Sequence, residues 1–123
     1  MSAQVEFQEP SQVSIADASH VKLQRLVEDK YFAEMRDAYR FAVALALHRG
    51  AKPAKAEGPR QTLYSVSTLD PDGVLKLAID TLVDGKNEPA FKLGERLAEW
   101  GIDEIDRLLR DEHLRIEDVL ADE

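Results

Sequence analysis

One stretch of nineteen residues constrains the fold more than any other part of the chain. It runs from residue 32 to residue 50 and reads FAEMRDAYRFAVALALHRG. Apolar side chains recur in it at helical spacing over four turns, at Phe32, Met35, Tyr39, Ala42, Val43, Ala46 and Leu47. Phe41 and Leu45 widen this face. We therefore expect a helix that is central to a core or that supplies a contact between subunits.

The same stretch carries the signals of a helix end. Gly50 can take the left-handed backbone conformation that commonly follows a helix, and His48 and Arg49 complement the negative charge of a helix C-terminus. Residues 51–61 contain two prolines and Gly58. They predict an exposed loop after the helix.

Capping residues and apolar spacing divide the remaining chain into further helices. Asp70 is the predicted cap of one of them, and Gly101 is the predicted stop of another. The predicted helices run from Asp17 or Ser19 to Asp29, from Pro71 to Val83, from Pro89 to Trp100, over a short stretch after Asp103, and over the last apolar residues, Ile116, Val119 and Leu120.

Two short segments have the character of β-strands. Residues 12–15 alternate polar and apolar side chains, and residues 62–68, TLYSVST, are β-branched and aromatic. The predicted fold class is nonetheless all-α, a compact irregular bundle of about five helices with at most one short β element near residues 12–15 or 62–68. A flexible N-terminal tail, residues 1–11, is expected to precede a single helical domain, residues 12–123.

The apolar faces of these helices predict the core. It comprises Leu23, Leu26, Phe32, Met35, Tyr39, Val43, Leu47, Leu75, Ile79, Leu82, Leu97, Trp100, Ile105 and Leu108. A chain of 123 residues is long enough to bury such a core without disulfides, and this one has no cysteine. No apolar run approaches the about 20 residues of a membrane-spanning helix. The first residues do not resemble a secretory signal, so we expect a cytoplasmic protein.

Charge is distributed unevenly along the sequence. The net charge is −8; residues 1–60 carry nine Lys or Arg against eight Asp or Glu, whereas residues 61–123 carry seven against sixteen. The first half therefore has a net charge of +1 and the second half of −9. A local basic group in the first half is a candidate contact for nucleic acid, comprising Arg49, Lys52, Lys55 and Arg60. An acidic group in the second half is a candidate protein interface, comprising Asp103, Glu104 and Asp106.

Catalysis is not expected from these residues. The acidic clusters fall at predicted helix starts or on exposed helix faces, where solubility and the helix dipole explain them. The three histidines, His20, His48 and His113, form no metal-binding spacing, and no serine stands in a nucleophile motif. We therefore expect a non-enzymatic protein with no cofactor and no metal.

Two segments resemble a bacterial protein family. Residues 36–50, RDAYRFAVALALHRG, are similar to the Arg-Asp and Phe-Ala-x-Ala-Leu pattern of small proteins that accompany the Dnd loci of phosphorothioate DNA modification and restriction. Residues 91–105 resemble that family's Glu-x-x-Ala-x-x-Gly-(Ile/Leu) helix, here at Glu95, Ala98, Gly101 and Ile102. Together with residues 74–84, the resemblance spans about residues 20–105. It implies an accessory protein of anti-phage defence, and the family has no catalytic residues to carry over.

Two functions are compatible with these observations. The first is an adaptor that binds a protein of the defence system through its acidic half, in the extreme case as a mimic of DNA. The alternative is a DNA-binding accessory, or a ribbon-helix-helix-like dimer in which residues 12–15 of two chains pair and place Gln12 and Ser14 in the major groove. A homodimer is also possible, because the helix of residues 32–50 is apolar on more than one side.

Overall fold

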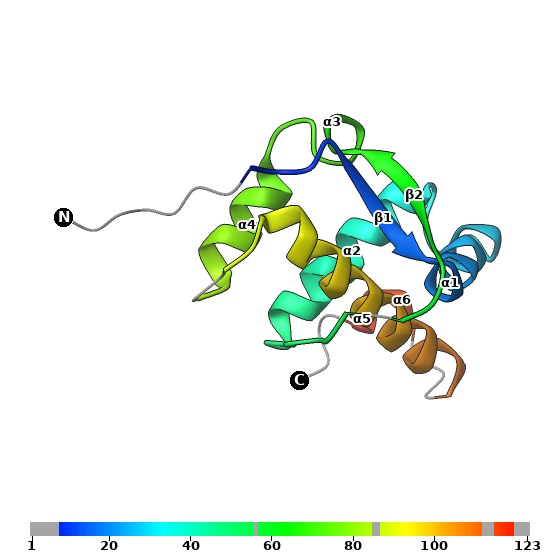
Figure 1. The fold of residues 1–123 in the computed structure, drawn as a ribbon. Coiled ribbons are helices and arrows are strands. Elements are labelled where there is room, and N and C mark those ends of the chain that lie inside the picture. The colour runs from blue at the N-terminus through cyan, green and yellow to red at the C-terminus, as the bar shows by residue number, and fades with distance from the viewer. Residues whose placement is uncertain (1–7, 56, 85–86, 112–114, 120–123) are drawn as a thin grey trace.

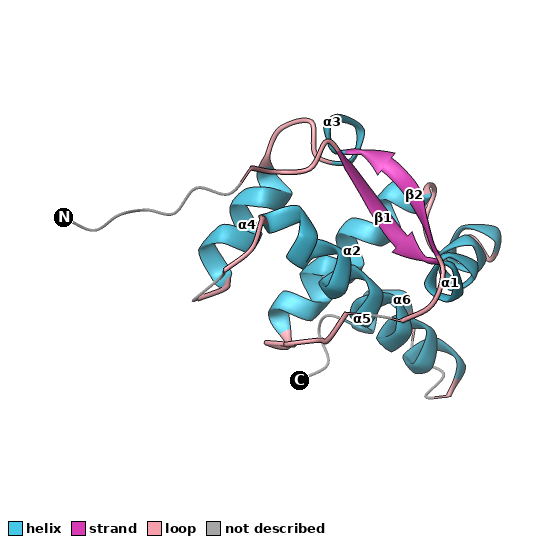
Figure 2. Ribbon diagram, viewed as in Figure 1, coloured by secondary structure: helices cyan, strands magenta, loops and turns pink. Residues whose placement is uncertain are grey.

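The computed structural model describes residues 8–55, 57–84, 87–111 and 115–119. Within these ranges the chain forms six helices and two strands (Figures 1 and 2). Their order is β1 (Gln12–Ala16), α1 (Asp17–Glu28), α2 (Met35–His48), β2 (Arg60–Ser65), α3 (Val66–Leu69), α4 (Val74–Leu82), α5 (Ala90–Arg110) and α6 (Ile116–Val119).

Helices α2 and α5 form the centre of the molecule. They cross each other, with α4 near one end of the pair and α1 near the other, and the two strands lie together along one side (Figure 1). One group of buried side chains lies between α2, α4 and the first half of α5. A second group lies between α1, α2 and the second half of α5. The segment expected to be central is therefore shared by both parts of the core.

The crossing of α2 and α5 depends on a residue whose role the sequence did not indicate. Gly101 was predicted to end a helix, but α5 continues through it to Arg110 and includes the predicted short helix after Asp103. A Cβ atom at Gly101 would overlap the backbone carbonyl of Ala42 on α2. The glycine is thus required by the close approach of two backbones, not by a helix end.

The fold is mostly helical, but it is not all-α. The two segments with strand character both form strands, and they pair with each other as an antiparallel sheet (Figure 2). The prediction of at most one β element was therefore wrong in number, because the partner of each strand lies more than 40 residues away in the sequence. The last part of the predicted segment, from Val66, forms the short helix α3 instead.

Helix α4 begins later than predicted but keeps its predicted cap. It starts at Val74, not at Pro71. The carboxylate of Asp70 accepts hydrogen bonds from the backbone amides of Leu75 and Lys76, over 2.9 and 3.0 Å. Asp70 therefore satisfies two of the free amides in the first turn of α4 across an intervening turn.

A side chain from the predicted tail caps α5 in the same way. The Glu9 carboxylate accepts hydrogen bonds from the amides of Ala90 and Phe91, over 2.9 and 3.0 Å. Residues 1–7 of that tail lie outside the described residues. Glu9 thus connects the start of the chain to the positive end of its longest helix.

Most of the predicted core is confirmed. Nine of its members are buried, namely Leu23, Leu26, Tyr39, Val43, Leu75, Ile79, Leu97, Ile105 and Leu108. Four are only half-buried, namely Phe32, Met35, Leu47 and Trp100. The prediction was wrong for Leu82, which is 64% exposed at the end of α4. Leu82 shares a helix face with Leu75 and Ile79, but it is the last residue of α4 and does not belong to the buried group that contains those two side chains.

Candidate functional site

A buried polar cluster joins α5 to the outer edge of β1. The backbone amide of Ser14 donates a hydrogen bond to Oε2 of Glu95 over 2.7 Å, and the amide of Ala16 donates to Oε2 of Glu99 over 2.9 Å. Glu95 and Glu99 are only 6% and 4% exposed. Two carboxylates of one helix therefore bind the edge of a strand that would otherwise carry unpaired amides in a buried place.

Arg60 on β2 neutralises these carboxylates. Its Nη2 atom lies 2.8 Å from Oε2 of Glu99 and 3.7 Å from Oε1 of Glu95, and its Nε atom donates to the Ser14 hydroxyl over 3.1 Å. The phenol of Tyr39 is buried near the cluster. Burial, followed by the negative charges of Glu95 and Glu99, raises the pKa of Tyr39 far above its ordinary range. Both carboxylates thus bind partners within the chain through Oε2, which indicates a structural role, whereas Oε1 of Glu99 and Nη1 of Arg60 are buried without a hydrogen bond to a described residue.

The sequence did not indicate this cluster. Nothing in it appeared to place two carboxylates in an apolar environment, yet both are buried. A weak signal was present, because Glu95 falls at helical spacing on the apolar stripe of α5 that contains Phe91, Ala98 and Ile102. A charged residue on such a stripe indicates a buried partner. That partner lies 81 residues away, on β1.

The structure separates the members of the predicted basic group. Arg49 donates to Glu104 over 3.2 Å, and Arg60 belongs to the buried cluster. Lys52 and Lys55 are exposed on the segment between α2 and β2. Two of the four predicted cations are thus committed to ion pairs within the chain.

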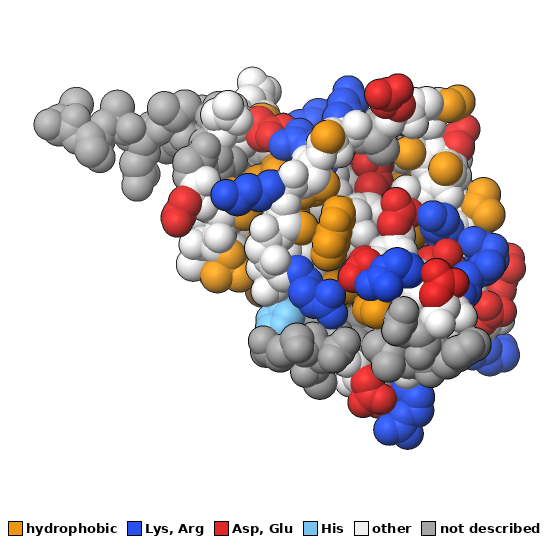
Figure 3. Space-filling view, turned by 90° about the horizontal axis from the view of Figure 1, so that it is seen from below, with side chains coloured by type: hydrophobic (Ala, Val, Ile, Leu, Met, Phe, Trp, Pro, Cys, Tyr) orange, Lys and Arg blue, Asp and Glu red, His pale blue; other side chains and the backbone are white. Residues whose placement is uncertain are grey.

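The predicted acidic group is also paired. Asp103 lies 3.0 Å from the Lys22 ammonium, and Asp106 lies 3.0 Å from the Arg110 guanidinium. Arg107 donates two hydrogen bonds to Glu104, and these bonds, followed by the charges of Arg107 and Arg49, lower the pKa of Glu104. Figure 3 shows Lys and Arg side chains interleaved with Asp and Glu side chains on one face of the molecule. The Arg49–Glu104 pair shows that members of the two predicted surfaces contact each other.

A charged cavity lies beside the buried cluster. Its volume is about 420 Å³, and it is lined by Ser14, Lys55, Arg60, Glu88, Pro89, Lys92, Glu95 and Arg96. Arg96 forms a two-pronged ion pair with Glu88, and Arg60 is held by Ser14 and by the buried carboxylates. Because its main cations are already neutralised by neighbouring side chains, this cavity indicates no particular ligand.

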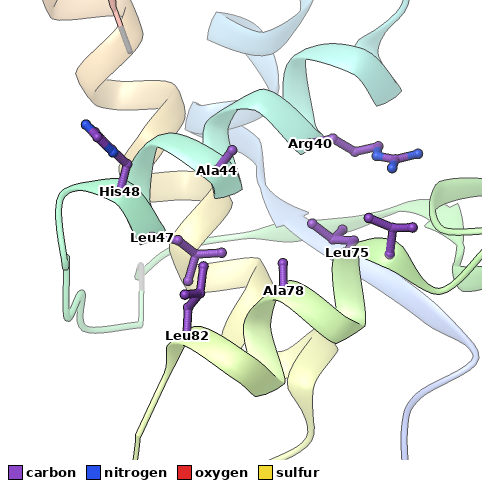
Figure 4. A pocket seen from close by; sticks show the side chains of 8 residues that line it. Arg40, Ala44, Leu47, His48, Leu75, Ala78 and Leu82 are labelled. Atoms are coloured by element: carbon purple, nitrogen blue, oxygen red, sulfur yellow. The ribbon is translucent and has the colours of Figure 1, made fainter. Parts of the chain in front are cut away.

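A second cavity has a different, apolar character. It lies between α2 and α4 and has a volume of about 340 Å³ (Figure 4). We call it the α2/α4 groove; its lining residues are Arg40, Ala44, Leu47, His48, Val74, Leu75, Ala78 and Leu82. Figure 4 shows Leu47 and Leu82 close together at one end and Arg40 extending from α2 at the other. Ala44 and Ala78 carry only methyl groups, so the facing sides of the helices leave this space open.

Exposure makes the α2/α4 groove distinct from an ordinary core gap. Val74 is 51% exposed and Leu82 is 64% exposed. The guanidinium of Arg40 makes no hydrogen bond or ion pair with any residue that the structure describes. The groove thus combines exposed aliphatic side chains with a cation that is available to an external partner.

Two further properties bear on the chemistry of the described residues. Among them, no three His, Asp or Glu side chains are grouped so that they could hold a metal ion. No helix in the same part of the chain has both the length and the apolar character needed to cross a membrane.

Comparison of the chain with protein-family models, with curated proteins and with solved structures found no match. The resemblance to Dnd-associated proteins therefore stays a prediction from the sequence. The features of the molecule that bear on function are the α2/α4 groove and the distribution of charge.

Proposed function

We propose that this protein is a non-enzymatic adaptor that acts by binding another protein, and that the α2/α4 groove is its contact surface. The observation that carries the proposal is the exposure of Val74 and Leu82 at the rim of an apolar groove. A contiguous exposed apolar surface with a polar rim is typical of a protein interaction site. Single exposed apolar side chains that are scattered over a surface would not indicate an interaction site.

The shape of the groove favours a helical partner segment. It lies between two helices, and its aliphatic lining spans α2 and α4. An amphipathic helix can place apolar side chains at i, i+3 and i+4 into such a groove. Arg40 at one end would pair with a carboxylate of that segment. The expected partner therefore presents a short apolar stripe with an acidic residue beside it.

The predicted acidic interface is less suited to this role. Asp103, Glu104 and Asp106 each already have a cationic partner within the chain. A basic protein would have to compete with those partners, whereas the groove requires no such exchange. We propose that these residues orient an approaching partner, because surface charge mainly affects the rate at which two proteins meet.

The resemblance supports a particular class of partner. If the chain is an accessory protein of a Dnd-type locus, its partner is a modification or restriction protein encoded beside it. We propose that the adaptor contributes to DNA modification or anti-phage defence through that contact.

The test is co-expression and affinity purification with each modification and restriction protein of such a locus, followed by titration of the purified pair. Leu82→Glu places a charge in the groove and should abolish the binding. Leu77→Glu is the matched control, because Leu77 is also 64% exposed on α4 but does not line the groove. Equal binding by both variants would exclude the groove as the contact surface.

A DNA-binding accessory remains the second candidate, supported by the exposed Lys52 and Lys55. The ribbon-helix-helix version is disfavoured, because one edge of β1 pairs with β2 and the other binds Glu95 and Glu99. Fluorescence anisotropy with plain and phosphorothioated duplexes over a salt series tests direct binding. Salt-sensitive binding that is lost in a double Lys52→Gln and Lys55→Gln variant would favour this candidate over the adaptor.

A further inference from the structure

The two outer edges of the sheet differ in how they are covered. The outer edge of β1 is closed by the Glu95 and Glu99 carboxylates. Strand β2 pairs with β1 along its inner edge, and the two strands form the whole sheet of the described chain. The carboxylates that close the outer edge of β1 therefore do not reach the outer edge of β2.

The register identifies the backbone groups on that open edge. The amides of Ser14 and Ala16 point toward α5, and thus away from β2. Their cross-strand partners, Thr62 and Arg60, therefore occupy non-hydrogen-bonded positions and direct their own backbone groups away from β1. Thr62 is exposed, and among the described residues no backbone hydrogen bond outside the sheet involves it.

This edge lacks two of the usual protections against pairing, an outward charged side chain and a proline. Exposed edges are commonly guarded by charged side chains, by proline or by a covering element. Residues 61–65, QTLYS, contain neither a charge nor a proline. The charge of Arg60 is turned toward Glu99. A bulge at Leu63 shortens the edge, so that pairing would be centred on Thr62.

We infer that the outer edge of β2 pairs with the same edge of a second copy of this chain. Two β2 strands related by a twofold axis would exchange backbone hydrogen bonds at Thr62 and form one antiparallel sheet in the order β1–β2–β2–β1. Both outer strands of that sheet would be β1, and both outer edges would be closed by Glu95 and Glu99. A second copy fits this position because its own β1 edge is already closed by the same two carboxylates, so the combined sheet has no open outer edge.

The test is sedimentation equilibrium of the full chain from about 1 µM to about 1 mM. The average mass should rise from 13.8 kDa toward twice that value. Thr62→Pro removes the outward amide without removing a bond to β1, and should stay monomeric. Thr62→Val keeps the amide and should associate like the wild type. A wild-type chain that is monomeric over the whole range overturns the inference.

A second measurement is independent of whether the proline variant folds. Hydrogen exchange of the wild-type Thr62 amide should slow at least tenfold between the dilute and the concentrated samples. An exchange rate that does not change while the mass doubles would show that the dimer uses another surface. The groove variant Leu82→Glu should still dimerise; loss of its dimer would assign self-association to the α2/α4 groove and overturn the inference.

Discussion

The backbone amide nitrogen of Ala16 lies 2.9 Å from Oε2 of Glu99, and this contact joins β1 to the middle of α5. Glu95 makes the equivalent contact with Ser14 one helical turn earlier. Residues four apart on a helix are separated by about 6 Å along its axis. Residues two apart on a strand are separated by about 6.7 Å. The near match lets two carboxylates of α5 serve as hydrogen-bond partners for alternate amides of β1, as a third strand would.

Replacing Glu99 tests the strength of this contact. Glu99→Leu leaves the Ala16 amide without its acceptor and Arg60 without its nearest carboxylate, and we expect a loss of about 3 kcal/mol or more in the free energy of unfolding. Urea denaturation measures it. Glu99→Gln keeps an acceptor for the Ala16 amide and should lower the free energy of unfolding by less.

A control separates this effect from general loss of charge. Asp103→Asn removes a carboxylate from an exposed ion pair with Lys22 and should change the free energy of unfolding by less than about 1 kcal/mol. If Glu99→Leu were as mild as Asp103→Asn, the buried cluster would have no stabilising role.

Gly101 gives a second prediction, because it sets the distance between α2 and α5. Gly101→Ala would place a methyl group against the Ala42 carbonyl, and backbone atoms of two helices cannot move apart without loss of packing. We expect a loss of about 1–3 kcal/mol in the free energy of unfolding, measured by chemical denaturation.

Gly94 on the same helix is the comparison. A Cβ there would lie 3.2 Å from Cδ1 of Ile79, the end of a side chain that can shift slightly. Alanine also has the higher helix propensity. Gly94→Ala should therefore be close to neutral. Equal losses at the two positions would mean that helix conformation, and not the contact with Ala42, explains the glycines.

The contrast between these glycines shows what the sequence could and could not reveal. Apolar spacing is a local property, and it predicted α2 and most of the core correctly. The role of Gly101 depends on Ala42, which lies 59 positions earlier, so local signals suggested a helix end instead. The same limitation applies to Leu82, which has the spacing of a buried residue but is 64% exposed at the last position of α4.

Charged residues reveal less from their sequence positions than apolar residues do. Position along the chain suggested one basic and one acidic surface, but Arg49 and Glu104 form a pair in the fold. Arg60 is likewise committed to the buried carboxylates of α5. The effective charge of a surface depends on partners from other elements, and a single sequence does not contain that information.

Tyr39 gives a prediction about pH. Its raised pKa means that the folded protein keeps this phenol protonated when an unfolded chain would release the proton. The stabilising contribution is therefore complete below the ordinary tyrosine pKa of 10.0 and declines as pH rises above it. The free energy of unfolding should fall by up to about 1.4 kcal/mol per pH unit from this residue alone.

Tyr39→Phe separates the contribution of the Tyr39 phenol from that of lysines, which titrate in a similar pH range. The Tyr39 hydroxyl is buried and makes no hydrogen bond with the described residues, so its removal should leave stability at neutral pH unchanged or slightly higher. Above pH 10, the free energy of unfolding of the variant should exceed that of the wild type by a margin that grows with pH. A constant difference across that range would show that Tyr39 ionises normally in the folded protein.

The last prediction concerns two apolar positions that the sequence alone treats as equivalent. Val43 is completely buried on α2, whereas Leu82 is 64% exposed at the groove. Val43→Asp places an unpaired charge in the core and should abolish cooperative unfolding, as followed by circular dichroism. Leu82→Glu should retain the wild-type transition midpoint within a few degrees, because its carboxylate stays in water. A folded Val43→Asp variant would contradict the central position of α2. An unfolded Leu82→Glu variant would contradict the open groove, and any loss of partner binding would then reflect unfolding.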